Sequence, residues 1–422
     1  MLRFSCSPTG DMHLNELRIA LFNYIVAKQR NENLIVRIDD MDKEQHIEGK
    51  DQEILDILGL FQVEHAQVIY QSQNIRFHSA MALQLLHEKK AFSCFCSDGW
   101  LEKKRQEAKE TNYTYHYDDA CRNLPAELVI DNTAPFSVRI VRPDKPIIIQ
   151  DKIQGKTSFD PDTIDSFVIM NQDKTPTHDF ASAVDDMLND ISIIINEVTD
   201  MGNSAKQEHV RNQLSYEKTL EYAHMTPIMG GNTHVKQLLE EGYLPEAISN
   251  YLISIGNTTP KEIFTFKEAA QWFTFDTVDC EAVSFDIETL KHINKEHMRL
   301  LDPKELSRYV GFADVEIGEL ARLFLAEVST TRELKERIMS IFSSRDIPEE
   351  FTHQTALITK TIQNAPYFEM YEDFKNYVID KTKLNEDDFL RSLRVLLINN
   401  EKGPDIADIY KYLKNYIKEI IK

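Results

Sequence analysis

Three cysteines and a tyrosine lie close together in the sequence, in an arrangement that can hold a metal ion. Cys94 and Cys96 form one pair, and Tyr117 and Cys121 form a second pair within the same short segment. Structural zinc takes four ligands at tetrahedral geometry, and thiolate sulfur is one of its preferred donors. We therefore predict a structural zinc site at these four residues, with His116 as a competing fourth ligand. The alternative is that the cysteines are buried, reduced thiols and the segment folds without metal.

A second group of polar residues follows two apolar runs near the amino end. Residues 2–4 are followed by turn formers at 7–10, a helical pattern begins near His13, and the β-rich run 34–38 ends in an acidic run, 39–42. This order predicts a β-α-β unit and a parallel sheet, whose ligands bind at the carboxyl ends of the strands. The acidic run could also hold magnesium, but a charge run at a strand end is more often a solvated face.

The remaining elements must position these residues. Short β-like runs recur at 137–141, 147–150, 166–170 and 191–195. They predict an insertion within the sheet domain and then a return to the sheet. From about Phe285 onward the pattern is nearly all helical. There, Asp302-Pro303 predicts a helix start, and Thr330 with Glu333 predicts a capping box.

Composition limits the classes of function that the chain can have. The 422 residues carry 48 Lys+Arg and 69 Asp+Glu, a net charge of −21, so a polyanion must be bound by a local basic surface. Five cysteines, an odd number, favour thiols or metal ligands over a disulfide framework. No apolar run is long enough to span a membrane and no signal peptide is evident, so we expect a cytoplasmic protein.

Several segments, in order, resemble the glutamyl-tRNA synthetases, a family of class I aminoacyl-tRNA synthetases. The opening Arg3-Phe4, then Ser7-Pro8-Thr9-Gly10, is similar to the family's first strand and turn, and residues 37–42 are similar to its Arg-Ile-Glu-Asp-Thr-Asp. The cysteine segment resembles the family's zinc-bearing insertion, in which a tyrosine ligand occurs in relatives. Further matches fall at 175–180, 238–247, 393–394 and 403–404.

The resemblance implies an α/β fold and a particular domain order. It implies a Rossmann-like, catalytic-type domain at 1–285. That domain would contain an α+β, zinc-bearing, acceptor-binding-like insertion at about 70–185 and stem-contact-like helices at about 235–285. An all-helical, anticodon-binding-like domain would follow at 286–422. The family's activity, ATP-dependent attachment of glutamate to tRNA, then implies tRNA as a partner, with neither a membrane nor DNA involved.

Five residues match positions that line the family's amino-acid pocket. They are Arg3, Ser5, Ser7, Asp39 and His178. A small ligand could bind there, or Arg3 could pair with Asp39 or Asp40 while the pocket is filled. Asp39 stands where the family has a longer glutamate and His178 where it has a tyrosine, so the pocket is reshaped in either case.

The first departure from the family lies at the start of the first helix. The family begins this helix with His-Ile-Gly-His or His-Ile-Gly-Asn, whereas this chain has His13-Leu14-Asn15-Glu16. Asn15 adds a side chain where the family uses glycine. Glu16 adds a negative charge at a helix amino end that favours phosphate. We expect ATP binding to be weakened, which leaves His13 as a vestigial phosphate contact.

Two more departures concern positive charge in the same site. Asn196 stands where the family has an arginine that pairs with the substrate carboxylate, and a neutral amide cannot form that ion pair. The family's Lys-Met-Ser-Lys-like loop is reduced to residues 230–234, which contain no lysine. In the family, those ammonium groups stabilise the charge that develops during adenylate formation.

The sequence therefore predicts a synthetase-like protein that is catalytically degenerate. It would bind tRNA or a partner of the tRNA-charging machinery, such as an active sibling synthetase. The first alternative is an active glutamate-tRNA ligase, which would use ATP and magnesium with unconventional residues. The second is a protein-interaction scaffold without RNA binding.

Overall fold

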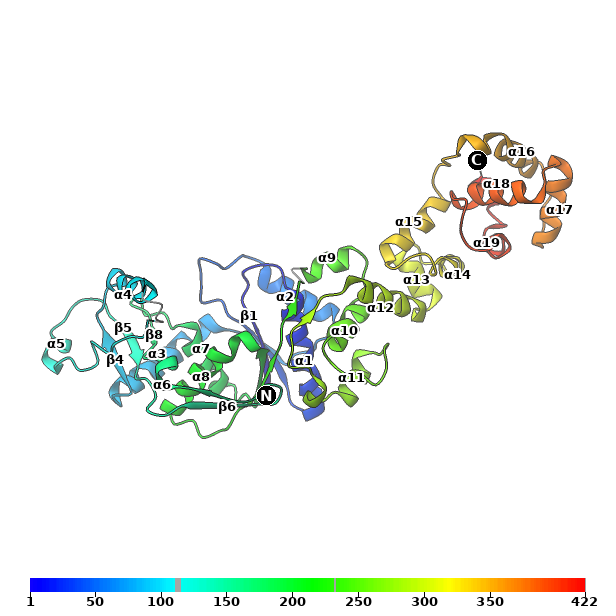
Figure 1. Ribbon diagram of the computed structural model, residues 1–422. Coiled ribbons are helices and arrows are strands. Elements are labelled where there is room, and N and C mark those ends of the chain that lie inside the picture. Colours follow the sequence, from blue (N-terminus) through cyan, green and yellow to red (C-terminus); the bar gives the residue numbers. More distant parts are fainter. Residues whose placement is uncertain (111–114, 231–232, 422) are drawn as a thin grey trace. The chain divides into compact units, whose positions relative to one another are not determined.

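The computed structural model describes residues 1–110, 115–230 and 233–421, and the chain divides into two compact units. The first unit comprises residues 1–235 and 252–285, and the second comprises residues 236–251 and 286–422. Figure 1 labels their helices and strands. Among the residues that the structure describes, no helix has the length and apolar character that a membrane crossing requires.

The first unit is built on a seven-stranded sheet with the strand order β3-β2-β1-β9-β10-β6-β7. Its strands are β1 (Leu2–Cys6), β2 (Leu34–Ile38), β3 (Gln67–Tyr70), β6 (Ile147–Asp151), β7 (Gly155–Phe159), β9 (Ile193–Glu197) and β10 (Glu221–Met225). All neighbouring pairs are parallel except β6 and β7. The predicted α/β fold with a parallel sheet is confirmed. Strand order reverses between β1 and β9, the position at which such sheets bind ligands.

Helices cover this sheet because its central strands are rich in apolar residues that need burial on both faces. All five residues of β2 are buried, as expected for a parallel strand covered on both faces. The main covering helices are α1 (Leu14–Arg30), α2 (Lys50–Leu60), α7 (His178–Leu188) and α8 (Met201–Gln213). Helix α1 begins after His13, whose backbone N–H donates to Glu16 Oε2 at 2.7 Å, and it ends at Asn31 in the left-handed region. Glu16 is therefore engaged in capping its own helix.

A smaller antiparallel sheet, with the order β4-β5-β8, forms the cysteine-bearing part of the first unit. Its elements are α3 (Ile75–His87), β4 (Ala91–Cys94), α4 (Asp98–Glu110), α5 (Ala126–Ile130), β5 (Ser137–Ile140), α6 (Pro161–Ile164) and β8 (Val168–Met170). Leu85, Ile140 and Ile169 share a buried cluster with Phe180 of α7. The run 147–150 lies outside this small sheet because it forms β6 of the main sheet.

Short elements follow β10 in the chain, and residues 236–251 among them belong to the second unit. They are β11 (Ile228–Met229), α9 (Val235–Glu240), α10 (Pro245–Ser254), α11 (Phe266–Trp272) and β12 (Val283–Ser284). β11 and β12 pair in parallel. Helix α11 packs on α1, where the rings of Tyr24 and Phe266 stack with centroids 5.1 Å apart.

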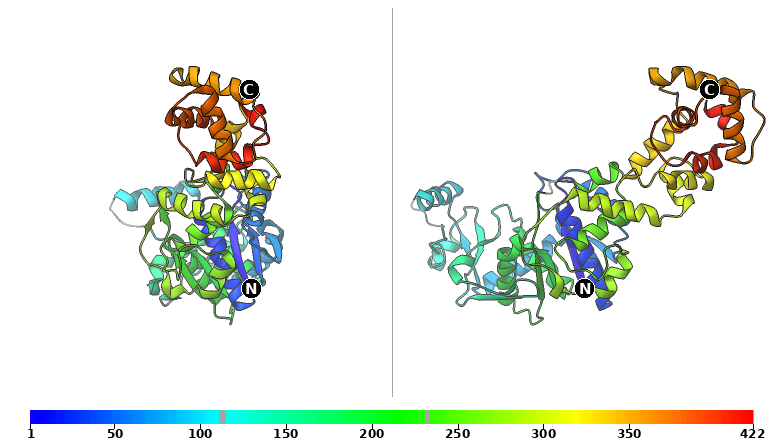
Figure 2. Two further views of the ribbon diagram at one scale, coloured as in Figure 1. Left: turned by 90° about the vertical axis from the view of Figure 1, so that its right-hand side faces the viewer. Right: turned by 45° about the vertical axis from the view of Figure 1, so that its right-hand side comes forward.

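Helices alone form the described part of the second unit beyond residue 286 (Figure 2). They are α12 (Ile287–Leu300), α13 (Pro303–Tyr309), α14 (Val315–Leu323), α15 (Thr331–Ile341), α16 (Thr352–Gln363), α17 (Tyr371–Thr382), α18 (Glu386–Ile398), α19 (Ile406–Leu413) and α20 (Ile417–Ile420). Both predicted helix starts are confirmed, since Asp302 and Thr330 each form a capping box. Gly318 is required by close packing, because a Cβ there would lie 1.7 Å from the carbonyl oxygen of Pro303.

Candidate functional site

A cavity of about 240 Å³ opens at the carboxyl ends of β1, β2 and β9, where the strand order reverses. Four of the five residues predicted for the small-ligand pocket line it, namely Ser5, Ser7, Asp39 and His178. Parallel strands end at one edge of the sheet, which brings these distant parts of the sequence together. Arg3 is not among the lining residues.

Arg3 is buried and forms a different ion pair from the one predicted. Its Nε lies 3.1 Å from Asp186 Oδ1, and its Nη1 donates to Asn196 Oδ1 at 3.1 Å. The predicted pairing of Arg3 with Asp39 or Asp40 is wrong. Arg37 takes Asp39 instead, because residues two apart on a strand share a face. Its Nε donates to Asp39 Oδ1 at 2.7 Å.

Asp40 faces a different partner altogether. Its carboxylate accepts hydrogen bonds from the backbone N–H and the hydroxyl of Ser72, at 2.8 and 2.6 Å. It therefore caps the turn that precedes α3 and takes no part in an ion pair with Arg3.

Asp39 and His178 form a charged pair at the cavity wall. Burial would raise the pKa of Asp39, but Arg37 and His178 outweigh it and hold the pKa well below its usual range. Hydrogen bonds with Asp179 and Asp39 raise the pKa of His178 to about 9. His178 Nε2 lies 3.3 Å from Asp39 Oδ2. At neutral pH the pair is therefore an aspartate and an imidazolium.

Apart from His178, the ionisable carboxylates of the cavity wall form an acidic group. Glu16, Glu197 and Asp200 line the cavity together with Asp39, and none of the lining residues that the structure describes is a Lys or an Arg. Burial raises the pKa of Glu197, and the nearby Asp200 and Glu16 raise it further. A carboxyl pKa is raised in this way when negative charges repel one another in a partly desolvated space.

Two amide side chains of α8, Asn203 and Gln207, also line the cavity, and the sequence analysis missed both. The available signal was their spacing of four residues, which places both on one face of a helix that follows a strand end. Together with Asn196 they give the cavity three neutral amides.

The start of α1 borders a second cavity of about 130 Å³, lined by residues 9–13 together with Ser7 and Glu16. His13 is exposed, and its ring lies against that of His234, with centroids 4.4 Å apart. Asn15 Oδ1 accepts a hydrogen bond from the backbone N–H of Ile228 at 2.9 Å. The side chain of Asn15 thus fastens β11 to the helix start. Of the shortened loop 230–234, residues 231 and 232 lie outside the described residues.

The cysteine cluster assembles as predicted. The Sγ atoms of Cys94, Cys96 and Cys121 all lie within 4.8 Å of one another, and the last two are 3.6 Å apart. The Tyr117 hydroxyl is 3.4 Å from the sulfurs of both Cys94 and Cys96. Burial would raise the pKa of Cys94, but its hydrogen bonding with Tyr117 and the bond that Arg139 donates to it lower that pKa. The three thiols can hold one metal ion. His116 is exposed and lies outside the cluster that the structure describes.

Comparison with known proteins identifies the class of protein to which the chain's fold belongs. The family model for tRNA synthetases class I (E and Q), catalytic domain, matches residues 1–292. The fold resembles the crystal structure of a glutamate tRNA ligase from Elizabethkingia meningosepticum in complex with its amino acid. The TM-score is 0.85 at 22% sequence identity, and the match covers 99% of this chain and 97% of that chain. These matches place the chain among the class I synthetases by fold.

Curated relatives match over the full length. The chain is 56% identical to glutamate-tRNA ligase 2 of Sulfurimonas denitrificans, with 100% of each protein covered. It is 43% identical to glutamate-tRNA ligase 1 of a Nitratiruptor species and 42% identical to glutamate-tRNA ligase 1 of Campylobacter jejuni, again with 100% of each covered. The chain belongs to the glutamyl-tRNA synthetase family.

Proposed function

We propose that this chain binds tRNA, or a partner of the tRNA-charging machinery such as an active sibling synthetase, without activating glutamate. The observation that carries the proposal is the charge of the two cavities at the sheet edge. Five carboxylates, of Asp11, Glu16, Asp39, Glu197 and Asp200, line them, and no Lys or Arg does so among the described residues. ATP and glutamate are both anions, so this lining repels the two small substrates of the family's reaction.

The contacts of the buried Arg3 support the part of the proposal that concerns glutamate, namely that the chain does not bind it. Two nitrogen atoms of the Arg3 guanidinium already donate to Asp186 and Asn196. Asn196 stands where the family has a second arginine, and it accepts from Arg3 rather than offering a positive charge. Leaving a buried carboxylate without its cation costs about 3–5 kcal/mol, or more than a hundredfold in affinity.

The shortened loop supports the part of the proposal that concerns catalysis, namely that glutamate is not activated. Residues 230–234 contain no lysine, so the ammonium groups that would stabilise the developing phosphate charge are missing from the sequence. Removing one preorganised donor of this kind commonly costs about 10²–10³ in rate. The three departures act on one reaction, and each lowers its rate.

Two assays on the full chain test the proposal. ATP–pyrophosphate exchange with each of the twenty amino acids, with and without tRNA, should show no glutamate-dependent signal. Titration with total tRNA over a series of salt concentrations should show binding that weakens with a linear log-log slope, because several phosphates release counterions. Clear exchange with glutamate would overturn the catalytic part, and absence of salt-sensitive binding would leave a scaffold without RNA binding.

The second candidate function is an active glutamate-tRNA ligase that uses ATP and magnesium. The full-length identity of 56% to glutamate-tRNA ligase 2 of Sulfurimonas denitrificans favours it. In that case the Asp39 and His178 pair would hold the amino acid, and backbone N–H groups at the start of α1 would contact phosphate. The exchange assay separates the two candidates directly.

We also propose that the cysteine cluster holds structural zinc, with Tyr117 as the fourth ligand. Zinc–sulfur bonds of ~2.3 Å at tetrahedral angles put neighbouring sulfurs ~3.8 Å apart and a ligand oxygen ~3.5 Å from each sulfur. The distances of 3.6 and 3.4 Å in the cluster fit this arrangement. Arg139 donates to Cys94 Sγ at 3.3 Å and lies over the Tyr117 ring, so it would offset the negative charge of such a site. The metal would brace the insertion.

A further inference from the structure

A third cavity of the first unit lies in its cysteine-bearing part and has a volume of about 420 Å³. Helix α3, the segment that leads into β5 and the turn that follows β8 form its walls. It shares no described lining residue with the two cavities at the sheet edge. Small-molecule sites usually have volumes of about 300–1,000 Å³, so this cavity has room for an organic ligand.

The floor of the cavity is apolar and is held by core packing. Ala82, Val138 and Met170 line it, and all three belong to one buried hydrophobic cluster of the first unit. Phe136 lines the cavity from the segment before β5, and its ring centroid lies 5.5 Å from that of Phe95. A ligand would therefore meet a surface that is already in place.

The rim of the cavity leaves apolar side chains in contact with water. Leu83 of α3 is 64% exposed and Phe136 is 40% exposed, and both line the cavity. Covering apolar area of this kind is favourable, because that area is removed from water. The rim thus favours a ligand with a hydrocarbon part.

The polar lining comes mainly from one wall. Asn171, Gln172 and Lys174 belong to the turn after β8, and Ser79 of α3 is the other polar residue of the described lining. The turn is ordered by its own hydrogen bonds. The backbone N–H of Lys174 donates to the carbonyl oxygen of Asn171 at 3.0 Å, and Asn171 Nδ2 donates to Thr175 Oγ1, also at 3.0 Å. A few placed polar groups of this kind fix the orientation of a ligand.

Lys174 is the one charged residue of the described lining. Within the described part of the chain, its ammonium group has neither a hydrogen-bond partner nor an ion-pair partner. The neighbouring carboxylate of Asp173 accepts hydrogen bonds from the hydroxyl and the backbone N–H of Thr175, at 2.6 and 2.9 Å. The ammonium group of Lys174 is therefore available to an anion.

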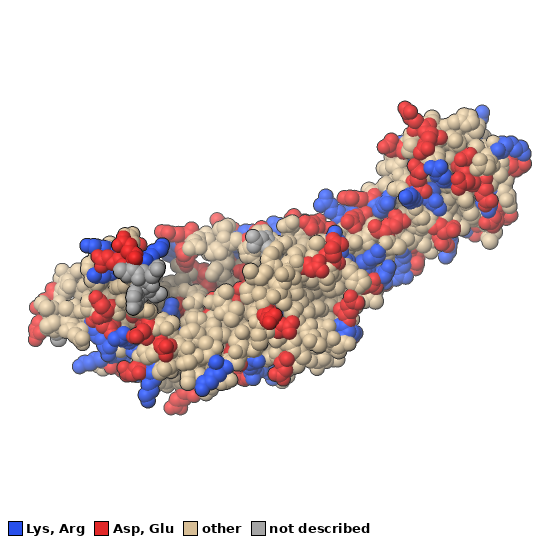
Figure 3. All heavy atoms as spheres, viewed as in Figure 1, with Lys and Arg blue, Asp and Glu red and all other residues tan. Residues whose placement is uncertain are grey.

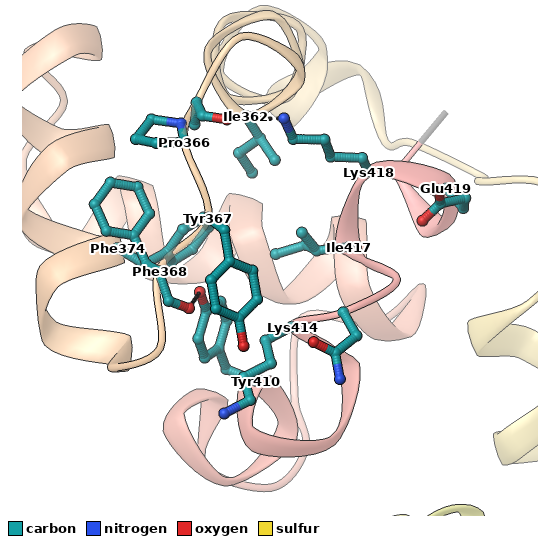
Figure 4. A pocket seen from close by; sticks show the side chains of 12 residues that line it. Ile362, Pro366, Tyr367, Phe368, Phe374, Tyr410, Lys414, Ile417, Lys418 and Glu419 are labelled. Atoms are coloured by element: carbon teal, nitrogen blue, oxygen red, sulfur yellow. Dashed lines mark hydrogen bonds between the residues drawn. The ribbon is translucent and has the colours of Figure 1, made fainter.

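The small aromatic pocket of the second unit shows the opposite arrangement (Figure 4). Its volume is about 140 Å³, and two lysines line it. Lys414 pairs with Glu369, and Lys418 Nζ donates to the carbonyl oxygen of Ala365 at 2.7 Å. Both lysines are engaged within the unit, so neither is left for a ligand.

Charge sets the third cavity apart from most of the surface. The chain carries 69 Asp+Glu against 48 Lys+Arg, and acidic side chains are spread over the face seen in Figure 3. None of the described residues that line the cavity is acidic, and one is a lysine. A single positive charge beside an apolar floor is complementary to a single negative charge on an apolar body.

We propose that this cavity binds a small amphipathic anion, namely an apolar monocarboxylate. Its hydrocarbon part covers Leu83 and Phe136, and its carboxylate pairs with Lys174. Burial of the hydrocarbon supplies most of the affinity, and the charge pair sets the orientation. A polyanion is not favoured, because one cation neutralises only one phosphate. The inference is independent of the proposed function.

Calorimetric titration of the full chain with decanoate, and with 1-decanol as the uncharged probe, tests the proposal. The native chain should bind one decanoate with a Kd on the order of 100 μM. Lys174→Gln should weaken decanoate binding about two- to fivefold and leave decanol binding unchanged, since only the carboxylate pairs with the ammonium group. Leu83→Asp should weaken the binding of both probes about tenfold or more, because it removes apolar area from the rim.

Lys89→Gln and Leu60→Asp are the matched controls. Lys89 is exposed and has a positive φ, as Lys174 has, and Leu60 is 55% exposed. Neither lines the cavity, so both variants should bind decanoate as the native chain does.

Four results would overturn the proposal. They are no saturable decanoate binding by the native chain, an equal loss in either control, and equal weakening of decanoate and decanol binding in Lys174→Gln. The fourth is a native dimer in sedimentation that Leu83→Asp dissociates, because a second copy of the chain would then cover the rim.

Discussion

Asp186 is the side chain on which the charge arrangement beneath the cavity depends. Its Oδ1 lies 3.1 Å from Arg3 Nε and 3.0 Å from Arg37 Nη1, and all three side chains are almost completely buried. A buried charge is tolerated when its partners remain, and it becomes expensive when one partner is removed. The two arginines therefore share one buried carboxylate beneath the cavity.

Neutralising this carboxylate should be costly. We expect Asp186→Asn to lower the free energy of unfolding of the first unit by about 3–5 kcal/mol, because it leaves the buried guanidinium of Arg3 without a carboxylate and removes one of the two carboxylates that Arg37 contacts. Both tryptophans, Trp100 and Trp272, lie in the first unit, so tryptophan fluorescence during urea unfolding reports on it. Asp200→Asn, which alters a half-buried cavity carboxylate, is the control and should change little. A loss below about 1 kcal/mol in Asp186→Asn would contradict this role.

The imidazolium of His178 predicts a pH dependence of stability. Its pKa in the folded chain is raised to about 9, above the ~6.5 of an unfolded chain. Its contribution is therefore complete below about pH 6.5 and disappears as the pH rises through about 9. The side chain is 57% exposed, so we expect about 1 kcal/mol or less.

Urea unfolding at pH 6 and pH 10 measures this contribution. The native chain should lose more stability between the two pH values than His178→Asn does, since the variant has no imidazole to deprotonate. Equal losses in the two proteins would show that His178 is not charged through its pairing with Asp179 and Asp39.

At the scale of elements, local signals predicted more than long-range contacts did. The helix start at Asp302-Pro303 and the capping box of Thr330 with Glu333 depend on residues at most three positions apart, and both form as predicted. The partner of Arg3 could not be read in this way, because Asp186 lies 183 positions away on α7. The sequence shows that strand ends meet at one edge, but not which buried carboxylate a given arginine reaches.

In the candidate site too, residues with a local sequence signal were predicted, and residues whose role depends on long-range packing were not. Ser5, Ser7, Asp39 and His178 come together because each lies at a strand end or a helix start that the pattern indicates. Asn203 and Gln207 were missed because polar residues on a helix usually face solvent, and only the packing of α8 turns them toward the cavity. The acidity of the cavity also emerges only when Glu197 and Asp200 are placed beside Asp39.

We expect the cysteine-bearing insertion to bind one zinc ion. Purified under reducing conditions, the native chain should contain about one zinc per chain, and Cys121→Ser should contain almost none, because the sulfur cluster loses one of its ligands. Cys280→Ser is the control, since Cys280 is exposed and its Sγ donates to the carbonyl of Ile153. Chelation should lower the thermal stability of the native chain and leave that of Cys121→Ser unchanged. Metal-free native protein with unaltered stability would contradict the zinc proposal.

At the scale of the whole molecule, family membership does not by itself establish the chemistry of the site. The chain aligns over its full length with proteins named glutamate-tRNA ligases, so its fold and length match theirs. The differences that we connect with function lie at one edge of one sheet and in the loop beside it. A family can keep a fold while the activity of its site changes, because function depends on the site and not on the fold.

The central claim is that the sheet-edge cavities do not hold the reaction intermediate of the family. Calorimetric titration of the full chain with a non-hydrolysable analogue of glutamyl adenylate tests it most directly, with an active glutamate-tRNA ligase as the positive control. We predict no saturable binding up to about 1 mM analogue, because five carboxylates line the cavities and, within the described part of the chain, no Lys or Arg does so. Saturable binding of one analogue per chain at micromolar concentration would contradict the claim.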